Sequence, residues 1–297
     1  MVVGEYLLYH YEPSFIAAVI FIALFGITSA LHFIQLVRNR TWYFIPFLIG
    51  GLFECLGYVG RAMNSKQKQG EWTTGPYIMQ SLLLLLAPAL FAASIYMVLG
   101  RIIRLTGGNE HSVVRVNWLT KIFVAGDVIS FLAQSGGGGI LAQAKKQSQV
   151  NMGQYVITGG LCIQLLFFGL FIVVAAIFHW RMYTNPTQRA LGTHINWERH
   201  LFVLYIASLF IMVRSVFRVI EYVMGQDGPL LSNEVYLYVF DAALMFLTML
   251  LFNVQHPNFS KADLEDRSSV RRHRRRRSHR SGDVEAGVEY VMTSRNK

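Results

Sequence analysis

Seven long apolar stretches alternate with short polar segments along the chain. They lie near residues 14–37, 42–63, 76–100, 118–141, 153–179, 199–222 and 234–254. Each is long enough to cross a hydrocarbon core ~30 Å thick as a helix, which takes about 20 residues. Because backbone groups in lipid must be hydrogen-bonded within their own segment, each stretch is predicted to be helical. The pattern predicts an all-α polytopic membrane protein, a seven-transmembrane-helix bundle.

The polar ends of the chain set its domain organisation. We expect a short extracellular N-terminus at 1–13, a transmembrane domain at 14–254 and a disordered basic cytoplasmic tail at 255–297. The tail holds eleven of the 27 lysines and arginines, so the rest of the chain is more apolar than its overall 53% hydrophobic content indicates. The tail is interpreted either as binding anionic inner-leaflet lipid or as a solvated topology anchor. Nucleic acid is not expected as a partner.

Basic residues between the apolar stretches predict the orientation. If the N-terminus is outside, the inner segments carry more basic residues than the outer segments do. The inner positions are Arg38, Arg40, Arg101, Arg104, Arg115, Arg181, Arg189 and the tail, and the outer positions are Lys66, Lys68, Lys145 and Lys146. The bias predicts an outside N-terminus and a cytoplasmic C-terminus, in a multi-pass protein that we assign to the plasma membrane.

Ionisable residues inside the apolar stretches are the main functional signal. An unpaired charge at the bilayer centre costs about 2.5–3.5 kcal/mol, so these residues must face one another or water. Polar residues recur every three or four positions, which keeps them on one helix face. Together these considerations give a candidate site of Glu54, Arg61, Gln80, Asp127, Gln134, Gln164, Arg214, Arg218, Glu221 and Asp241.

The depth of these residues predicts where the site opens. Arg61, Arg214 and Arg218 lie in the half of the bundle near the N-terminal side, whereas Glu54 and Asp127 lie nearer the middle. We infer a polar cavity that opens outward, with arginines near its mouth and carboxylates deeper. The alternative is a fixed network of buried ion pairs that only locks the helices together.

Glycines mark positions where helices can approach closely. Gly57 and Gly60 in the second stretch, and Gly159 and Gly160 in the fifth, are small residues of the kind found at membrane helix interfaces. A further run, residues 136–139, ends the fourth stretch and is either a flexible gate or a loose helix end.

These residues occur in segments that resemble one known family. The segments are Gly50–Glu54, Gly57–Arg61, Pro76–Ser81, Ala87–Pro88, Leu99–Arg101, Gly126–Ser130, Gln134, Gly160–Leu161, Gln164, Arg214–Tyr222, Tyr238–Asp241 and His256–Pro257. In combination they closely resemble the fungal lipid-translocating exporter family, also called the RTA-like family, over roughly residues 14–257. The resemblance implies a seven-span fungal membrane protein that protects cells from membrane-active lipids, including sphingoid long-chain bases and aminosterols. One branch of the family is linked to porphyrin uptake.

Three functions remain open at this point. The first is a lipid transporter or translocase for an amphipathic lipid, passive or proton-coupled, because no GxxxxGK[ST] motif for ATP occurs. Such a transporter would not be an enzyme and would need no cofactor. The second is a seven-span lipid sensor or receptor. The third is an intramembrane zinc hydrolase, for which His32, His179, His200 and His256 near the inner helix ends are the only hint. The transporter is the preferred reading, and no metal is expected.

Overall fold

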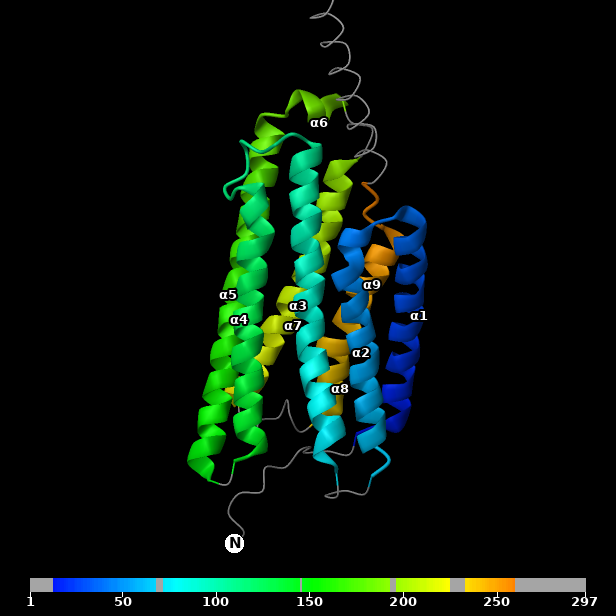
Figure 1. Cartoon of the computed structure of the whole chain (residues 1–297), viewed down its shortest axis with the longest axis vertical. Helices are drawn as coiled ribbons and strands as arrows, with labels where there is room; N and C mark the ends of the chain where they lie inside the picture. Colours follow the sequence, from blue (N-terminus) through cyan, green and yellow to red (C-terminus); the bar gives the residue numbers. More distant parts are fainter. Residues whose placement is uncertain (1–12, 68–71, 145, 193–195, 225–232, 260–297) are drawn as a thin grey trace, which may run out of the picture. The chain divides into compact units, whose positions relative to one another are not determined.

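A computed structural model describes residues 13–67, 72–144, 146–192, 196–224 and 233–259 (Figure 1). These residues form helices, and none of them lies in a β-strand. The helices are α1 (Phe15–Asn39), η1 (Trp42–Phe44), α2 (Ile45–Asn64), α3 (Thr74–Leu105), α4 (Val116–Ala142), α5 (Gln147–Thr184), α6 (Gln188–Gly192), α7 (Trp197–Met224), α8 (Glu234–Leu237), η2 (Tyr238–Ala243) and α9 (Leu244–Val254). Most of the N-terminal segment 1–13 and nearly all of the tail 255–297 lie outside the described residues, so both assignments stay predictions.

The seven predicted spans are confirmed. Seven helical segments are long and apolar enough to cross a bilayer, with η1 and α2 forming the second and α8, η2 and α9 the seventh. Their bounds agree with the sequence prediction to within a few residues except in α3 and α5, which are 32 and 38 residues long. At 1.5 Å per residue these helices measure about 48 and 57 Å, well beyond the hydrocarbon thickness.

The two long helices end at backbone signals and not where their apolar character ends. Gly107, two residues beyond α3, has a φ of 67°, the left-handed conformation that commonly follows a helix end. Helix α5 stops at Thr184, shortly before Pro186, which disfavours helical backbone in the residue before it. Hydropathy therefore locates the part of a helix that lipid surrounds, whereas glycine and proline locate its end.

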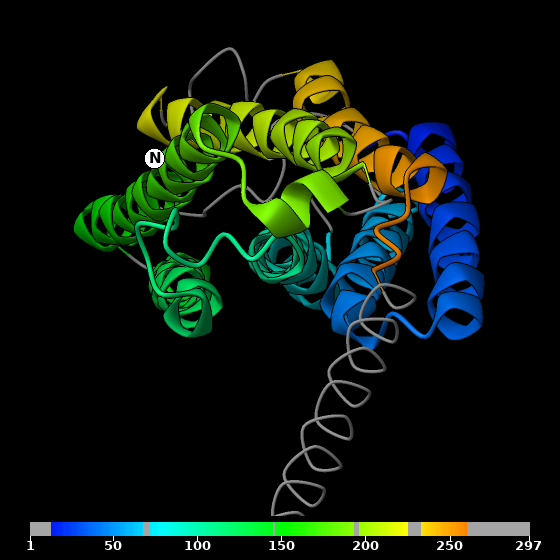
Figure 2. The same ribbon diagram turned by 90° about the horizontal axis from the view of Figure 1, so that it is seen from above.

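The spans follow one another around a closed ring. Each span packs against the next along the chain, and the ring closes where α9 contacts α1. Figure 2 shows this order, with α1 and α2 on one side and α4 and α5 on the other. The most extensive pairings join α4 with α5 and α2 with α3, each of which is an antiparallel helical hairpin. A sequential ring needs no crossing connections, which fits the short loops.

Helix α3 is the most buried helix of the ring. It contacts α7 across the bundle as well as its neighbours α2 and α4. In its most apolar window 67% of the residues are buried, against 28% in α1 and in α4. The outer helices therefore direct most of their apolar side chains outward, as expected of surfaces that face lipid. Polar groups on α3 can reach partners on both sides of the bundle.

Glycines allow the closest helix contacts. A Cβ at Gly160 of α5 would lie 2.9 Å from the Ser130 carbonyl oxygen of α4, and one at Gly60 of α2 would lie 2.8 Å from the Pro76 carbonyl oxygen of α3. Both predicted close contacts are confirmed, whereas Gly159 has open space where a Cβ would be. The run at 136–139 is helical and lies in the last two turns of α4, which ends at Ala142, so both the flexible gate and the loose helix end stay predictions.

The adjacent glycines of α5 provide a matched test of this packing. We expect Gly160→Ala to destabilise the protein by about 1–3 kcal/mol, because the new methyl group collides with the α4 backbone. Gly159→Ala should leave stability unchanged or raise it by up to about 1 kcal/mol through helix propensity. Thermal unfolding of both variants in the same detergent measures the difference. Equal melting temperatures would contradict the close α4–α5 contact.

Candidate functional site

The candidate site residues point into the bundle and not toward lipid. All of them except Arg218 are at most 5% exposed. The Arg218 side chain is 14% exposed. The expectation that charged residues inside the spans point into the bundle is therefore confirmed.

Asp241 is the centre of the main charged cluster. Its two carboxylate oxygens accept hydrogen bonds from two arginines of α7, Arg214 Nε at 2.7 Å and Arg218 Nη2 at 2.6 Å. Arg218 also donates to the Glu221 carboxylate at 2.9 Å. Asp241 lies in η2, a short π-helical segment inside the seventh span. Such segments are rare and occur frequently at functional sites.

Arg214 has a second partner that a proline creates. Its Nη2 donates to the backbone carbonyl oxygen of Leu84 in α3 at 2.7 Å. In a regular helix this carbonyl would accept from the residue four positions later, which is Pro88 and has no N–H group. The arginine therefore satisfies a carbonyl that Pro88 leaves free, and it links α3 to α7 and Asp241.

Glu54 of α2 lies opposite the part of α3 where Pro88 removes a backbone hydrogen bond. A Cβ at Gly50 would lie 3.0 Å from the Ala87 carbonyl oxygen, and a Cβ at Gly57 would lie 2.7 Å from the Leu84 side chain, so α2 lies close against α3 on both sides of Glu54. Glu54 is 0% exposed, and neither carboxyl oxygen has a hydrogen-bond partner among the described residues. Asp241, Arg214 and Arg218 act on it electrostatically. It is a buried acid without a hydrogen-bond partner among the described residues, beside a cluster of paired charges.

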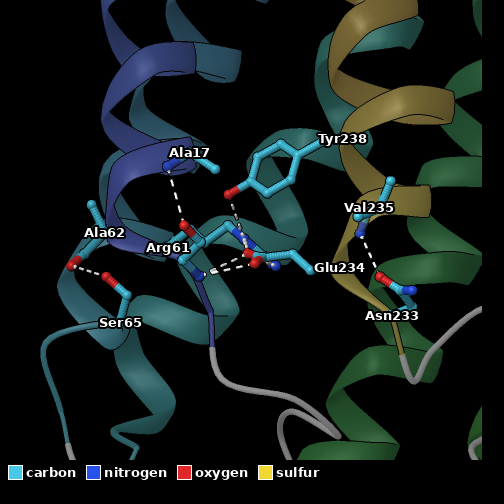
Figure 3. Close-up of polar contacts among 9 residues, drawn as sticks. Ala17, Arg61, Ala62, Ser65, Asn233, Glu234, Val235 and Tyr238 are labelled. Atoms are coloured by element: carbon cyan, nitrogen blue, oxygen red, sulfur yellow. Dashed lines mark hydrogen bonds and ion pairs between the residues drawn. The ribbon is translucent and has the colours of Figure 1, made fainter.

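Arg61 belongs to a separate contact nearer the helix ends. Its Nη2 lies 2.7 Å from Glu234 Oε1, and its Nε donates to the Tyr238 hydroxyl at 3.1 Å (Figure 3). Glu234 also accepts from the backbone N–H of Ser14 at 2.9 and 3.0 Å, next to the start of α1. Glu234 was missed as a site residue. The signal for it was its position on the face of the seventh span that carries Tyr238 and Asp241.

The remaining polar residues form contacts among α3, α4 and α5. The Tyr96 hydroxyl donates to Asp127 Oδ2 at 3.0 Å, while Asp127 Oδ1 has no partner among the described residues. Gln134 donates to Gln164 at 3.2 Å. Gln80 is buried on the face of α3 that α2 covers. Tyr96 was also missed, because a tyrosine in an apolar stretch is indistinguishable from a packing residue.

The site residues meet through direct contacts in several groups. One pocket of about 170 Å³ lies between α3, α4, α5 and α7, and another of about 540 Å³ lies at the opposite end of the bundle, where it is lined by Arg104 and Arg115 among others. None of the candidate residues lines either pocket. The single cavity shared by all ten residues stays a prediction.

The four histidines do not form a metal site. His32 and His256 are neighbours, with ring centroids 6.4 Å apart, but each ring bonds elsewhere, to the Met249 carbonyl oxygen and to the Thr41 hydroxyl. Burial lowers the pKa of His256, which lies beyond the last span, to about 4. Among the described residues no group of three or more histidines, cysteines or acids could hold a metal ion.

Seven membrane-spanning helices around a buried cluster of charges define a polytopic membrane protein with a polar core. Comparison with known proteins then places the chain in a family. Residues 47–262 match the family described as RTA1 like protein, and the chain belongs to that family. The resemblance seen in the sequence is thus confirmed.

Three similar proteins illustrate the range of this family. The chain is 33% identical to "Protoporphyrin uptake protein 1" over 84% of this chain and 91% of the relative, and 34% identical to "Protein RTA1" over 84% of each. It is 25% identical to "Sphingoid long-chain base transporter RSB1" over 80% of this chain and 70% of that protein. All three are from Saccharomyces cerevisiae. No solved structure matches the chain.

Two conservative substitutions separate the paired acid from the unpaired one. Asp241→Asn removes the anion that two arginines share, and breaking such a buried pair costs about 3–5 kcal/mol. Glu54→Gln removes no ion pair, so we expect its stability to stay within about 1 kcal/mol of the wild type. Thermal unfolding in detergent, with size-exclusion chromatography to check folding, measures both. A Glu54→Gln loss as large as that of Asp241→Asn would show that Glu54 has a structural partner.

Proposed function

We propose that this protein is a membrane lipid transporter or translocase that confers resistance to amphipathic lipids such as sphingoid long-chain bases and aminosterol-like compounds. Membership of the RTA1-like family and the name of the relative "Sphingoid long-chain base transporter RSB1" support a lipid as the substrate. The absence of an ATP-binding motif in the sequence favours passive or proton-coupled movement. The proposed localisation is the plasma membrane.

One observation favours transport over a fixed structural network. Glu54, at the centre of the bundle, is an acid without a hydrogen-bond partner among the described residues. A lock made only of ion pairs needs a partner for each charge, because an uncompensated buried charge is costly. Glu54 has no partner among the described residues, and Asp127 has only the Tyr96 hydroxyl. These two carboxyl groups are the proposed sites for a lipid ammonium group or a proton. The arginines Arg61, Arg214 and Arg218 balance the other acids or bind phosphate.

The orientation and the tail complete the proposal. The excess of arginine at one end of the helices supports an outside N-terminus and a cytoplasmic C-terminus. In that orientation the arginine-rich tail lies at the inner leaflet, where anionic lipid attracts basic segments by about 1 kcal/mol per residue.

Reconstitution into liposomes tests this function. Purified protein should speed the transbilayer movement of a fluorescent sphingoid base relative to protein-free liposomes, and less so that of a fluorescent phosphatidylcholine. Hydrogen bonds to charged groups contribute about 1.5–3 kcal/mol, so Glu54→Gln should slow the sphingoid base about tenfold or more. Imposing a pH gradient across the same liposomes distinguishes passive from proton-coupled movement.

Cys162→Ser is the matched control, because Cys162 is exposed on the lipid-facing side of α5. It should move lipid at the wild-type rate. Binding of the sphingoid base without movement across the bilayer would replace transport by a lipid sensor. Unchanged rates in both Glu54→Gln and Asp127→Asn would remove these two acids from the mechanism.

A further inference from the structure

A cleft lies between helices α3, α4, α5 and α7, apart from the charged clusters. It has a volume of about 170 Å³ and is formed by the first turns of α3, the last turns of α4, Ile157 of α5 and Tyr222 of α7. Because these are helix ends, the cleft lies toward one end of the bundle. The same end holds the start of α1 and Glu234. The expected depth is that of lipid headgroups and the first carbons of their chains.

The lining of the cleft combines hydroxyl groups with aliphatic surface and contains no charged side chain. Thr74, Tyr77, Ser81, Ser135 and Tyr222 supply the hydroxyl groups, and the remaining surface is apolar apart from two glycines. The Ser135 hydroxyl oxygen is buried and has no hydrogen-bond partner among the described residues. A buried hydroxyl without a partner costs free energy, which a bound polar group would recover.

The cleft borders the charged cluster through α7. Tyr222 interacts electrostatically with Arg218. The Arg218 Nε–H, which neither Asp241 nor Glu221 uses, is buried without a partner among the described residues. Tyr222 is therefore the lining residue through which a bound head would act on Arg218. Arg218 also acts electrostatically on Glu54, one of the two acids proposed for transport.

The size of the cleft limits what it can hold. Pockets for drug-sized ligands measure about 300–1,000 Å³, so a volume near 170 Å³ accommodates a small head and the first part of one alkyl chain. The glycines Gly138 and Gly139 line it, and a Cβ at either would meet nothing within 4 Å. They keep open a space that larger residues would fill.

We propose that this cleft binds the hydroxylated head of a single-chain lipid, a long-chain alcohol or amino alcohol, whose chain extends into the bilayer. The proposal rests on the lipid transport proposed above and adds the site at which the lipid enters. The hydroxyl lining selects for hydrogen-bonding heads over charged phosphates, and the volume selects for one chain over two.

The glycine run of α4 provides the test and its control. Gly138→Leu should fill the cleft without a clash, whereas Gly136→Leu makes the same change on the same helix at a position that does not line the cleft and also has open space. Full-length protein in liposomes is photolabelled with a photoreactive long-chain amino diol, and labelled peptides are quantified. We expect labelling of the α3 and α4 peptides to fall about tenfold in Gly138→Leu and to persist in Gly136→Leu.

Two further measurements define the chemistry. Unlabelled long-chain amino diol and long-chain alcohol should compete with the label, and diacyl phosphatidylcholine should not. Ser135→Ala should weaken labelling about threefold to tenfold, since it removes one hydrogen bond to the ligand, and should leave the melting temperature unchanged. If Gly138→Leu does not fold, Gly139→Leu replaces it.

The labelling results test lipid binding in the cleft separately from lipid movement across the bilayer. Equal labelling of the Gly138→Leu and Gly136→Leu variants overturns the cleft as the binding site, even if both variants move lipid across liposomes. Loss of labelling in Gly138→Leu, together with a wild-type protein that labels but moves no lipid, supports the cleft and overturns transport. Competition by phosphatidylcholine as strong as that by the amino diol overturns the choice of a single-chain ligand.

Discussion

The architecture depends on one carboxylate that two arginines share in the interior of a membrane bundle. Asp241 accepts from Arg214 and Arg218, so a single residue of the seventh span fixes two turns of α7. Exposed ion pairs contribute little to stability in water. Inside the bilayer, however, an unpaired charge is costly because no water is there to solvate it. The interaction therefore acts less as added stability than as a constraint on which helix faces can meet.

The same constraint explains why α3 is central. Pro88 leaves the Leu84 carbonyl oxygen without its helical donor, and Arg214 supplies one from α7. Glycines of α2 close the other side of the break and position Glu54 there. Two irregularities of the backbone, the proline in α3 and the π-helical segment around Asp241, thus meet at one charged cluster. Neither would be stable in lipid unless neighbouring helices satisfied its backbone groups.

The sequence predicted the spans and the inward direction of the charges, because both follow from the cost of exposing polar groups to lipid. It could not predict partners. Glu234 was not included in the candidate site although it pairs with Arg61, and neither was Tyr96, which bonds Asp127. Partner choice depends on the rotation and depth of each helix, which periodicity leaves undetermined. The same limit applies to helix ends, since Gly107 and Pro186 end α3 and α5 beyond their apolar stretches.

The polar core contains acids that pair with a cation and acids that do not. Tyr96 and Leu84 are three turns apart on α3, about 18 Å along its axis, so the Asp127 contact and the Asp241 cluster lie at different depths. At each depth one acid group lacks a cation: Asp127 at one, Glu54 at the other. A framework alone would gain nothing from leaving them unpaired. In the transport proposed above, these two acids at successive depths would bind the proton or the ammonium group in turn, and the cleft lies toward the end of the bundle from which the lipid would enter.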